Sequence, residues 1–156
     1  MKKILITTFI SILTIFAYSQ NSKNISKFEF SIIDSIKSKS ILLYRFSKEW
    51  IGLPYKMGGT SKSGIDCSAF SKTLYQNVYN IKIPRTAAQQ YNFVKKIKKS
   101  ELISGDLIFF KGKSWHVGVY LSNGYFIHAS NKKTGVKISS LTSNYYTSVY
   151  LSGGRI

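Results

Sequence analysis

The sequence predicts one α+β domain in which helices come first in the chain and pack on one side of an antiparallel sheet. In the first half of the chain, apolar residues recur at the three- and four-residue spacing of helices. After Lys99, short apolar segments separated by glycine, serine and asparagine indicate strands. Runs of helices followed by runs of strands are typical of α+β domains. The 156-residue chain is long enough for one such domain after a leader.

Residues 1–19 have the organisation of a signal peptide. Two lysines precede an apolar stretch over residues 4–16, and Ala17-Tyr18-Ser19 is a small-x-small cleavage site. The stretch is interrupted by hydroxyl residues and is shorter than the roughly 20 residues that span a membrane. An uncleaved tethering helix is therefore the weaker alternative. We expect export to the periplasm, cell envelope or medium, a flexible leader over residues 20–30, and no stable membrane span after cleavage.

Three helices are expected in the first half of the domain, which we place at residues 31–156. A first apolar stripe ends at Gly52 and Pro54. A second helix begins at Cys67, and a third begins near Thr86, where Gln89 completes the spacing of a capping box. The residues of the first stripe are Ile32, Ile36, Leu43, Phe46 and Trp50, and those of the second are Phe70, Leu74 and Val78.

The second half of the domain contains five predicted strands. They cover residues 107–110, 116–121, 125–129, 136–138 and 148–151. Ser122-Asn123-Gly124 lies between the second and third of them and indicates a hairpin.

Cys67 is the only cysteine in the chain. Asp66 is the expected N-cap of its helix, so free backbone N–H groups and the helix dipole should favour a thiolate at Cys67. Exported proteins tend to pair their cysteines, and a single one cannot form an internal disulfide. The lone thiol therefore indicates a chemical use, with a buried and inert cysteine as the alternative.

His116 and His128 are the only histidines, and both lie in the predicted hairpin. One cysteine at a helix start, with histidines downstream on strands, is the arrangement that a cysteine hydrolase needs. A metal site would need three or four ligands at short spacing, and Cys67 is far from both histidines in sequence. Metal binding and purely structural histidines are the alternatives; we expect no metal and no cofactor.

The register of the hairpin decides whether the two imidazoles meet. A plain two-residue Asn-Gly turn pairs Ser122 with Tyr125 and places His116 and His128 on opposite faces. We predict instead a three-residue loop or a bulge, which places both histidines on one face. That face is expected to pack on the Cys67 helix, with Gly118 leaving room for the rings. The apolar residues Val117, Val119, Leu121, Ile127 and Ala129 then share the other face.

The charge of the chain is strongly positive, with 23 lysines and arginines against 6 acidic residues. The densest run is Lys95-Lys96-Ile97-Lys98-Lys99. A solvated surface run is the simpler interpretation, and a polyanionic partner is the sharper one. For an exported protein that partner is an anionic cell-wall polymer or a membrane surface. No nucleic-acid-binding module is visible, so we expect no nucleic-acid partner.

Four motifs occur in order along the domain: Asp66-Cys67-Ser68, residues 105–110, residues 116–121 and Phe126-Ile127-His128-Ala129. Together they resemble the NlpC family of papain-like bacterial cell-wall cysteine peptidases. The resemblance also covers residues 52–59, residues 84–90 and the final Arg155-Ile156, so it extends over nearly all of the mature chain. It implies a papain-like fold with the helices packed on a C-terminal antiparallel sheet or open barrel.

The resemblance also implies roles for individual residues. Cys67 is the implied nucleophile, His116 the general base and acid, and His128 the group that orients His116. Tyr55 is expected to line the oxyanion side together with the Cys67 N–H, and Asp66 and Ser68 are expected to help hold the substrate.

The implied activity is hydrolysis of an amide bond in peptidoglycan stem peptides. In this family the bond typically joins D-glutamate to a diamino acid such as meso-diaminopimelate, which defines γ-D-glutamyl-diamino acid endopeptidases. Ala69 departs from the glycine that the family usually has there, and its methyl group is expected to narrow the cleft. Alternatives are a catalytically inactive wall-binding module, and an amidase or acyltransferase on the same fold. We expect a monomer.

Overall fold

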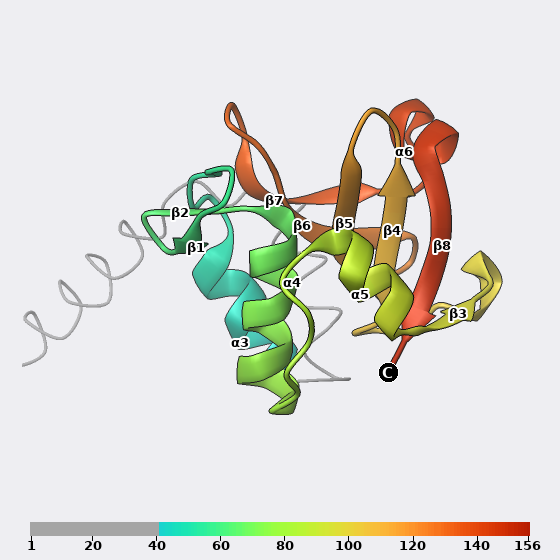
Figure 1. Cartoon of the computed structure of the whole chain (residues 1–156), viewed down its shortest axis with the longest axis horizontal. Coiled ribbons are helices and arrows are strands. Elements are labelled where there is room, and N and C mark those ends of the chain that lie inside the picture. The colour runs from blue at the N-terminus through green and yellow to red at the C-terminus, as the bar shows by residue number, and fades with distance from the viewer. Residues whose placement is uncertain (1–40) are drawn as a thin grey trace, which may run out of the picture.

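The protein is described from a computed structural model, which defines residues 41–156. The predicted signal peptide, the leader, and positions Ile32 and Ile36 of the first stripe lie outside the described residues. Six antiparallel strands form the main sheet in the order β3-β8-β4-β5-β6-β7 (Figure 1). Their bounds are β3 Lys95–Ile97, β4 Leu107–Lys111, β5 Trp115–Ser122, β6 Tyr125–Asn131, β7 Gly135–Ser140 and β8 Tyr150–Arg155. A short hairpin, β1 Thr60–Ser61 and β2 Gly64–Ile65, precedes the sheet in sequence.

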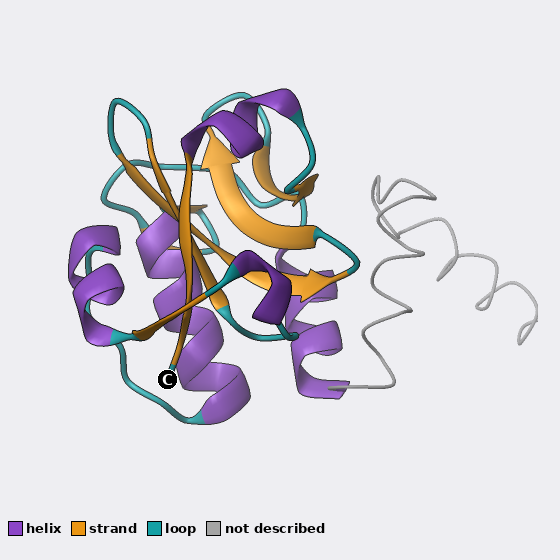
Figure 2. Ribbon diagram, turned by 90° about the vertical axis from the view of Figure 1, so that its right-hand side faces the viewer, coloured by secondary structure: helices purple, strands orange, loops and turns teal. Residues whose placement is uncertain are grey.

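Helices cover the sheet as the α+β prediction requires. Helix α4 packs on β5 and β6, and α5 packs on β5, so the early helices gather on one side (Figures 1 and 2). Helix α6 packs on β4, away from α3 and α4 in both views. The helical segments are α3 Ile41–Trp50, α4 Cys67–Leu74, α5 Ala87–Phe93, α6 Asn144–Val149, a π-helical extension η1 Tyr75–Tyr79 and a 3-10 turn η2 Lys99–Glu101.

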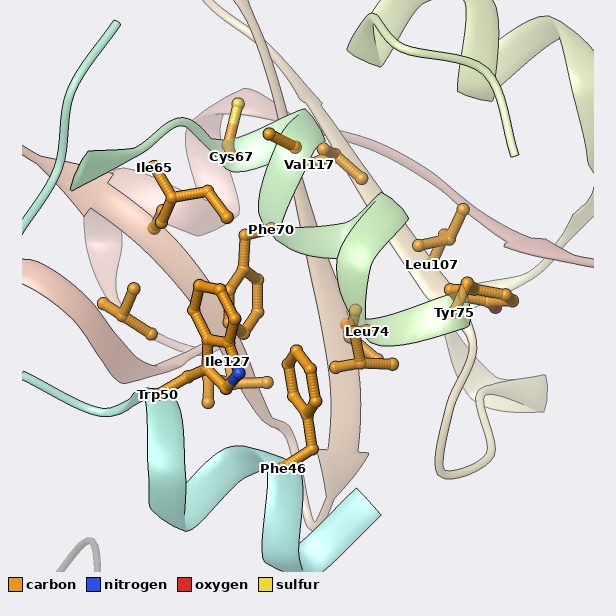
Figure 3. Close-up of a cluster of buried hydrophobic side chains, with 14 of the residues drawn as sticks. Phe46, Trp50, Ile65, Cys67, Phe70, Leu74, Tyr75, Leu107, Val117 and Ile127 are labelled. Atoms are coloured by element: carbon orange, nitrogen blue, oxygen red, sulfur yellow. The ribbon is translucent and has the colours of Figure 1, made fainter. Parts of the chain in front are cut away.

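The main core lies between α3, α4 and the sheet. Phe46 and Trp50 stack with their ring centroids 5.2 Å apart, and the ring of Phe70 from α4 packs against both (Figure 3). Leu43, Phe46 and Trp50 are buried, which confirms the described part of the first apolar stripe. Phe70, Leu74 and Val78 are buried too, which confirms the second. A second cluster on the other face of the sheet contains Ile108, Phe110, Phe126 and Leu141.

Both predicted helix starts are confirmed. The side chain of Asp66 accepts a hydrogen bond from the Ala69 N–H and caps α4, so Cys67 is the first residue of that helix. Thr86 and Gln89 form a reciprocal capping box at the start of α5. Each cap satisfies backbone donors that have no partner inside the helix, and both therefore fix where the chain enters a helix.

The hairpin between β5 and β6 combines the two alternatives that the sequence offered. Asn123 and Gly124 both have positive φ, 51° and 79°, so the turn has two residues and pairs Ser122 with Tyr125. The register shifts at Leu121, and Tyr120 then pairs with Phe126. The predicted three-residue loop is thus wrong and the predicted bulge is correct. The five apolar residues expected on one face, Val117, Val119, Leu121, Ile127 and Ala129, are all fully buried in the main core.

Three other expectations need correction: two concern the face of the hairpin that carries the histidines, and one concerns the last strand. Helix α4 packs on the apolar face that carries Val117 and Ile127, and not on the face of the two histidines, because its own inner residues are apolar. The space at Gly118 is occupied by the ring of Phe126, which lies 2.6 Å from where a Cβ would stand.

The strand predicted for residues 148–151 begins only at Tyr150 and extends to Arg155. Its Gly153 and Gly154 allow close approach by the side chains of Ile97 and Val94. Strand β3 is not among the predicted strands, and its two lysines belong to the basic run and are exposed.

Candidate active site

Cys67 lies at the N-terminus of α4, beside Val117 of strand β5 (Figure 3). Its side chain is nearly buried, with 8% of the residue exposed. The sulfur points away from the aromatic cluster of Phe46, Trp50 and Phe70 (Figure 3). Backbone N–H groups of Val117, Ser68 and Cys67 itself favour the thiolate. The helix start thus presents the thiol to the sheet with several donors around it.

The Val117 N–H is available to the thiol because β5 and β6 diverge at this point. In β5, the Tyr120 N–H donates to Asp106 at the start of β4, so by alternation the Val117 N–H points toward β6. The pairs between β5 and β6 end at Val119–Ile127, before Val117 is reached. The thiol therefore stands at the opening between two strands. His116 immediately precedes Val117, which places its backbone beside the same opening.

The two histidines contact each other directly. The Nε2 atom of His116 lies 2.6 Å from the Nδ1 atom of His128, and the rings are nearly perpendicular. On its other side, the Nε2 atom of His128 lies 3.0 Å from Ser139 Oγ and 3.3 Å from the Tyr146 hydroxyl. His128 is fully buried. This chain of contacts leaves Nδ1 of His116 without a partner in the histidine pair.

Burial sets the protonation of all three groups. It lowers the pKa of His116 to about 4. It also lowers the pKa of His128 well below its ordinary value, helped by His116 and by the positive charge of Lys137. Burial raises the pKa of the Cys67 thiol, the Val117 N–H opposes this, and the charge of Asp66 adds to it. The expected preference for a thiolate is thus outweighed by desolvation, and the resting site holds a neutral thiol beside neutral imidazoles.

Tyr55 and Asp66 lie on the other side of Cys67. Tyr55 forms a bridge with Ile65, two residues before Cys67, and its pKa is raised by burial and by the charges of Cys67 and Asp66. Its hydroxyl donates to the sulfur of Met57. Tyr55 is therefore close enough to the thiol for the two to interact electrostatically.

Every oxygen of Asp66 accepts hydrogen bonds from the protein. Arg85 donates from two nitrogens, at 2.7 and 3.0 Å, while the Gly58 N–H, the Ala69 N–H and the Ser68 hydroxyl complete the set. Burial alone would raise the pKa of Asp66, but the hydrogen bonds from Arg85 and the Ala69 N–H outweigh it and hold the pKa below its ordinary value. Arg85 also donates to Ser68 Oγ. Asp66 and Ser68 thus fix the loop and the helix start around Cys67.

Sequence reasoning did not assign a role to four residues that support this site. Arg85 holds Asp66, and buried Gln90 donates to the carbonyls of Ser68 and Pro84. Ser139 and Tyr146 contact His128. The register of β6 against β7 would have indicated Ser139, because Lys137 is directly opposite His128 and Ser139 follows on the same face. Tyr146 has no comparable signal, since it comes from a separate helix.

Residues 41–156 contain neither a candidate metal-binding cluster nor a helix that could span a membrane. No cluster of three or more histidine, cysteine, aspartate or glutamate side chains has a metal-binding arrangement there. No helix in the same part of the chain is long and apolar enough to cross a membrane. Ala69 is buried and, with Arg85, lines a cavity of about 260 Å³ beside α4.

Comparison with known proteins gives a consistent family. The NlpC/P60 family profile matches residues 52–155. Over 108 residues the chain is 51% identical to the "Probable endopeptidase NlpC homolog" of Haemophilus influenzae, covering 69% of this chain and 58% of that relative. It is 33% identical over 128 residues to the "Murein DD-endopeptidase MepS/Murein LD-carboxypeptidase" of Escherichia coli K12, covering 81% of this chain and 67% of that protein.

Solved structures agree with the sequence comparison. An NlpC/P60 family protein from Bacillus cereus superposes with a TM-score of 0.69 at 35% identity, covering 74% of this chain and 39% of that one. The NlpC/p60 domain of the peptidoglycan hydrolase SagA gives a TM-score of 0.65 at 28% identity, covering 74% of this chain and 97% of that domain. The family match covers more than half of the chain, and the identities and the shared fold agree with it. The chain therefore belongs to the NlpC/P60 family.

Proposed function

We propose that this protein is an exported cysteine peptidase that hydrolyses an amide bond in the stem peptides of peptidoglycan. The observation that carries the proposal is the arrangement at the β5–β6 opening. A lone thiol at a helix start faces the Val117 N–H, one residue from an imidazole whose far nitrogen is held by a second histidine. Relatives named as murein endopeptidases and a peptidoglycan hydrolase indicate the same substrate class.

The neutral resting state favours a general-base mechanism. Nδ1 of His116 takes the thiol proton as the sulfur attacks the carbonyl carbon of the scissile amide. The Cys67 N–H and the Tyr55 hydroxyl stabilise the oxyanion that forms. His116 then returns its proton to the leaving amine, which leaves a thioester on Cys67. A water molecule, deprotonated by His116, hydrolyses the thioester and restores the thiol.

His128 and the Asp66 cluster keep these groups in place. His128 contacts Nε2 of His116, which leaves Nδ1 as the nitrogen that would take the thiol proton. Asp66 and Ser68, clamped by Arg85, fix the wall of the cleft against which the stem peptide is held. We assign the scissile bond to D-glutamate and the following diamino acid, typically meso-diaminopimelate. Without residues 1–19 the chain keeps 21 lysines and arginines against 6 acidic residues, and this net charge of +15 would keep the exported enzyme on anionic wall polymer.

Digestion of defined muropeptides tests the substrate and the bond. The purified protein is incubated with a disaccharide tetrapeptide and with its cross-linked dimer, and the products are identified by mass spectrometry. The proposal predicts addition of one water and release of a dipeptide that begins with the diamino acid. Cleavage of the cross-link alone would reassign the bond. Binding without any product would favour an inactive wall-binding module, and transfer of the acyl group to an added amine would favour an acyltransferase.

A further inference from the structure

The side of His128 that faces away from His116 is enclosed by hydroxyl groups. Ser139 Oγ, on β7, and the Tyr146 hydroxyl, on α6, both lie within hydrogen-bond distance of the same nitrogen, Nε2. The Tyr146 hydroxyl also interacts with the side chains of Ser130 and Ser139. The ring of Tyr146 stands edge-on to His128, with the centroids 5.5 Å apart. A strand and the short helix that follows it thus converge on one atom of a fully buried histidine.

The proton on that nitrogen determines what His116 can do. A neutral imidazole carries one N–H and one lone pair, so the tautomer of His128 fixes the role of its Nδ1. If Nε2 of His128 carries the proton, Nδ1 accepts from Nε2–H of His116, and Nδ1 of His116 is free to take a proton from Cys67. In the opposite tautomer, Nδ1 of His128 donates, His116 carries its proton on Nδ1, and it cannot act as a base toward the thiol.

The surroundings of His128 favour the first tautomer. Two hydroxyl oxygens can both accept from a single Nε2–H, whereas the one lone pair of an unprotonated Nε2 can accept from only one hydroxyl. The other groups that face His128 are His116, Phe126 and the cation of Lys137, which is paired with His128 on the neighbouring strand β7. That cation disfavours a second proton on the ring. The two hydroxyl contacts point to a proton on Nε2, and burial together with the Lys137 cation keeps the imidazole neutral.

We propose that Ser139 and Tyr146 are positioning residues that hold His128 as the Nε2–H tautomer and thereby make His116 a base. The inference rests on the proposed cysteine-peptidase function for its kinetic consequences. Its structural content, the tautomer of His128, is independent of that function. Because either hydroxyl can accept the proton alone, the two are redundant: loss of one is tolerated, and loss of both releases the tautomer.

Ring-nitrogen NMR tests the tautomer directly. In protein with ¹⁵N-labelled histidine, the shifts and couplings of the ring nitrogens distinguish a protonated nitrogen from one with a lone pair. Substitution His116→Gln, which leaves one histidine, assigns the His128 signals. We expect a protonated Nε2 and an unprotonated Nδ1 on His128 in the unsubstituted protein at neutral pH. In Ser139→Ala/Tyr146→Phe we expect a mixture of tautomers.

Kinetics on a muropeptide supply the second readout. Ser139→Ala and Tyr146→Phe should each lower kcat by no more than about 5-fold, the equivalent of one ordinary hydrogen bond. The double variant should lose about 30-fold or more in kcat with little change in KM, a non-additive effect. Ser139→Thr/Tyr146→Phe, which keeps one hydroxyl, should retain the kcat of Tyr146→Phe alone, unlike the Ser139→Ala/Tyr146→Phe double variant. Matched controls are Ser140→Ala and Tyr145→Phe, neighbours that do not contact His128, and both should leave kcat unchanged.

The outcomes separate this inference from the proposed function. A proton on Nδ1 of His128 in the unsubstituted protein would overturn the inference, whatever the activity. So would a double variant that retains a pure Nε2–H tautomer and the unsubstituted kcat. If the protein has no peptidase activity on any muropeptide, the proposed function fails, but the NMR measurement still decides the tautomer. Circular dichroism of each variant verifies that it has folded.

Discussion

Nε2 of His116 lies 2.6 Å from Nδ1 of His128, although the turn between their strands contains only two residues. A two-residue turn with an unbroken ladder would place these side chains on opposite faces. The register shift at Leu121 returns them to one face. A single extra residue in β5 is therefore what makes the histidine pair possible.

Changing the residue count of β5 tests that relationship. Insertion of one alanine between Gly118 and Val119 would keep the pairs Val119–Ile127 and Tyr120–Phe126 and turn His116 away from His128. We expect loss of all detectable activity together with lower stability, because Val117 also changes face. Substitution Leu121→Ala keeps the register, so it should lower stability by about 2–5 kcal/mol but leave kcat of the folded fraction largely intact. Equal kcat in both folded variants would contradict the account.

Replacement of His128 by asparagine tests the orienting role. The amide oxygen of His128→Asn can accept from Nε2–H of His116, so we expect a partial loss of kcat, about 10- to 100-fold. His128→Ala should lose more, because it removes the partner and leaves a buried donor unsatisfied. The measurement is steady-state kinetics on a muropeptide. If His128→Ala has the same kcat as His128→Asn, the side chain does not act through an acceptor atom.

The acid limit of activity should reflect the lowered pKa of His116. The base must be neutral to take the thiol proton, and its pKa is about 4 instead of the ordinary 6.5. Activity is therefore retained as pH falls through 6.5 and is lost as pH falls through about 4. We expect a profile of kcat/KM between about pH 3 and pH 7 to show this low midpoint. A midpoint near 6.5 would mean that His116 is not desolvated.

The same shifts have a consequence for stability that must be controlled. In the folded state both imidazoles have pKa values below 6.5. The unfolded chain thus binds more protons as pH falls below 6.5, and stability decreases in that range. Circular dichroism at each pH separates this unfolding from titration of the base.

The ion pair between Arg85 and Asp66 should stabilise the folded protein. Arg85→Ala leaves a carboxylate that is only 8% exposed without its cation. We expect a loss of about 2 kcal/mol in the free energy of unfolding, at the low end for such pairs because Arg85 itself is 36% exposed. Lys62→Ala is the matched control, since its pair with Glu49 is more than half exposed and should contribute under about 1 kcal/mol. Urea unfolding that gave equal losses would remove the special role of Asp66.

Wall binding should depend on salt. Among the described residues, Asp66 and Asp106 form ion pairs with Arg85 and Arg155 and not with lysines. Most of the described lysines are exposed to solvent. Exposed charges are screened within about 8 Å at physiological ionic strength. We expect the Cys67→Ala protein to bind intact sacculi less tightly as sodium chloride increases, and sucrose to have no such effect. Equal binding at low and high salt would show that the lysines serve solubility alone.

The sequence predicted the parts of this site that depend on local rules. The caps at Asp66 and Thr86, the helix start at Cys67 and the face shared by Val117 and Ile127 follow from spacing and residue type. The prediction of a three-residue loop or a bulge depends on two requirements, a common face for the two histidines and a common face for the apolar residues of both strands. Contacts that join distant segments were beyond those rules, and Arg85 with Asp66 and Tyr146 with His128 are the examples.

The thiol illustrates a second limit. A helix start and neighbouring N–H groups predicted a favoured thiolate at Cys67, and both features are present. The depth of burial decides whether desolvation or these N–H donors control the pKa of the thiol, and that depth depends on how the whole domain packs. Local sequence therefore predicted the donors around the sulfur but not the net shift of its pKa.

The most direct measurement of the central claim is the digestion of purified sacculi by the unsubstituted protein, Cys67→Ala and Cys67→Ser, with soluble muropeptides quantified by chromatography. Activity requires the thiol as nucleophile, so both variants should release no product above background while folding normally. His116→Ala should be impaired to a similar extent, because nucleophile and base act as a unit. A chelator should leave the unsubstituted activity intact. Digestion by folded Cys67→Ala at the unsubstituted rate would contradict the account.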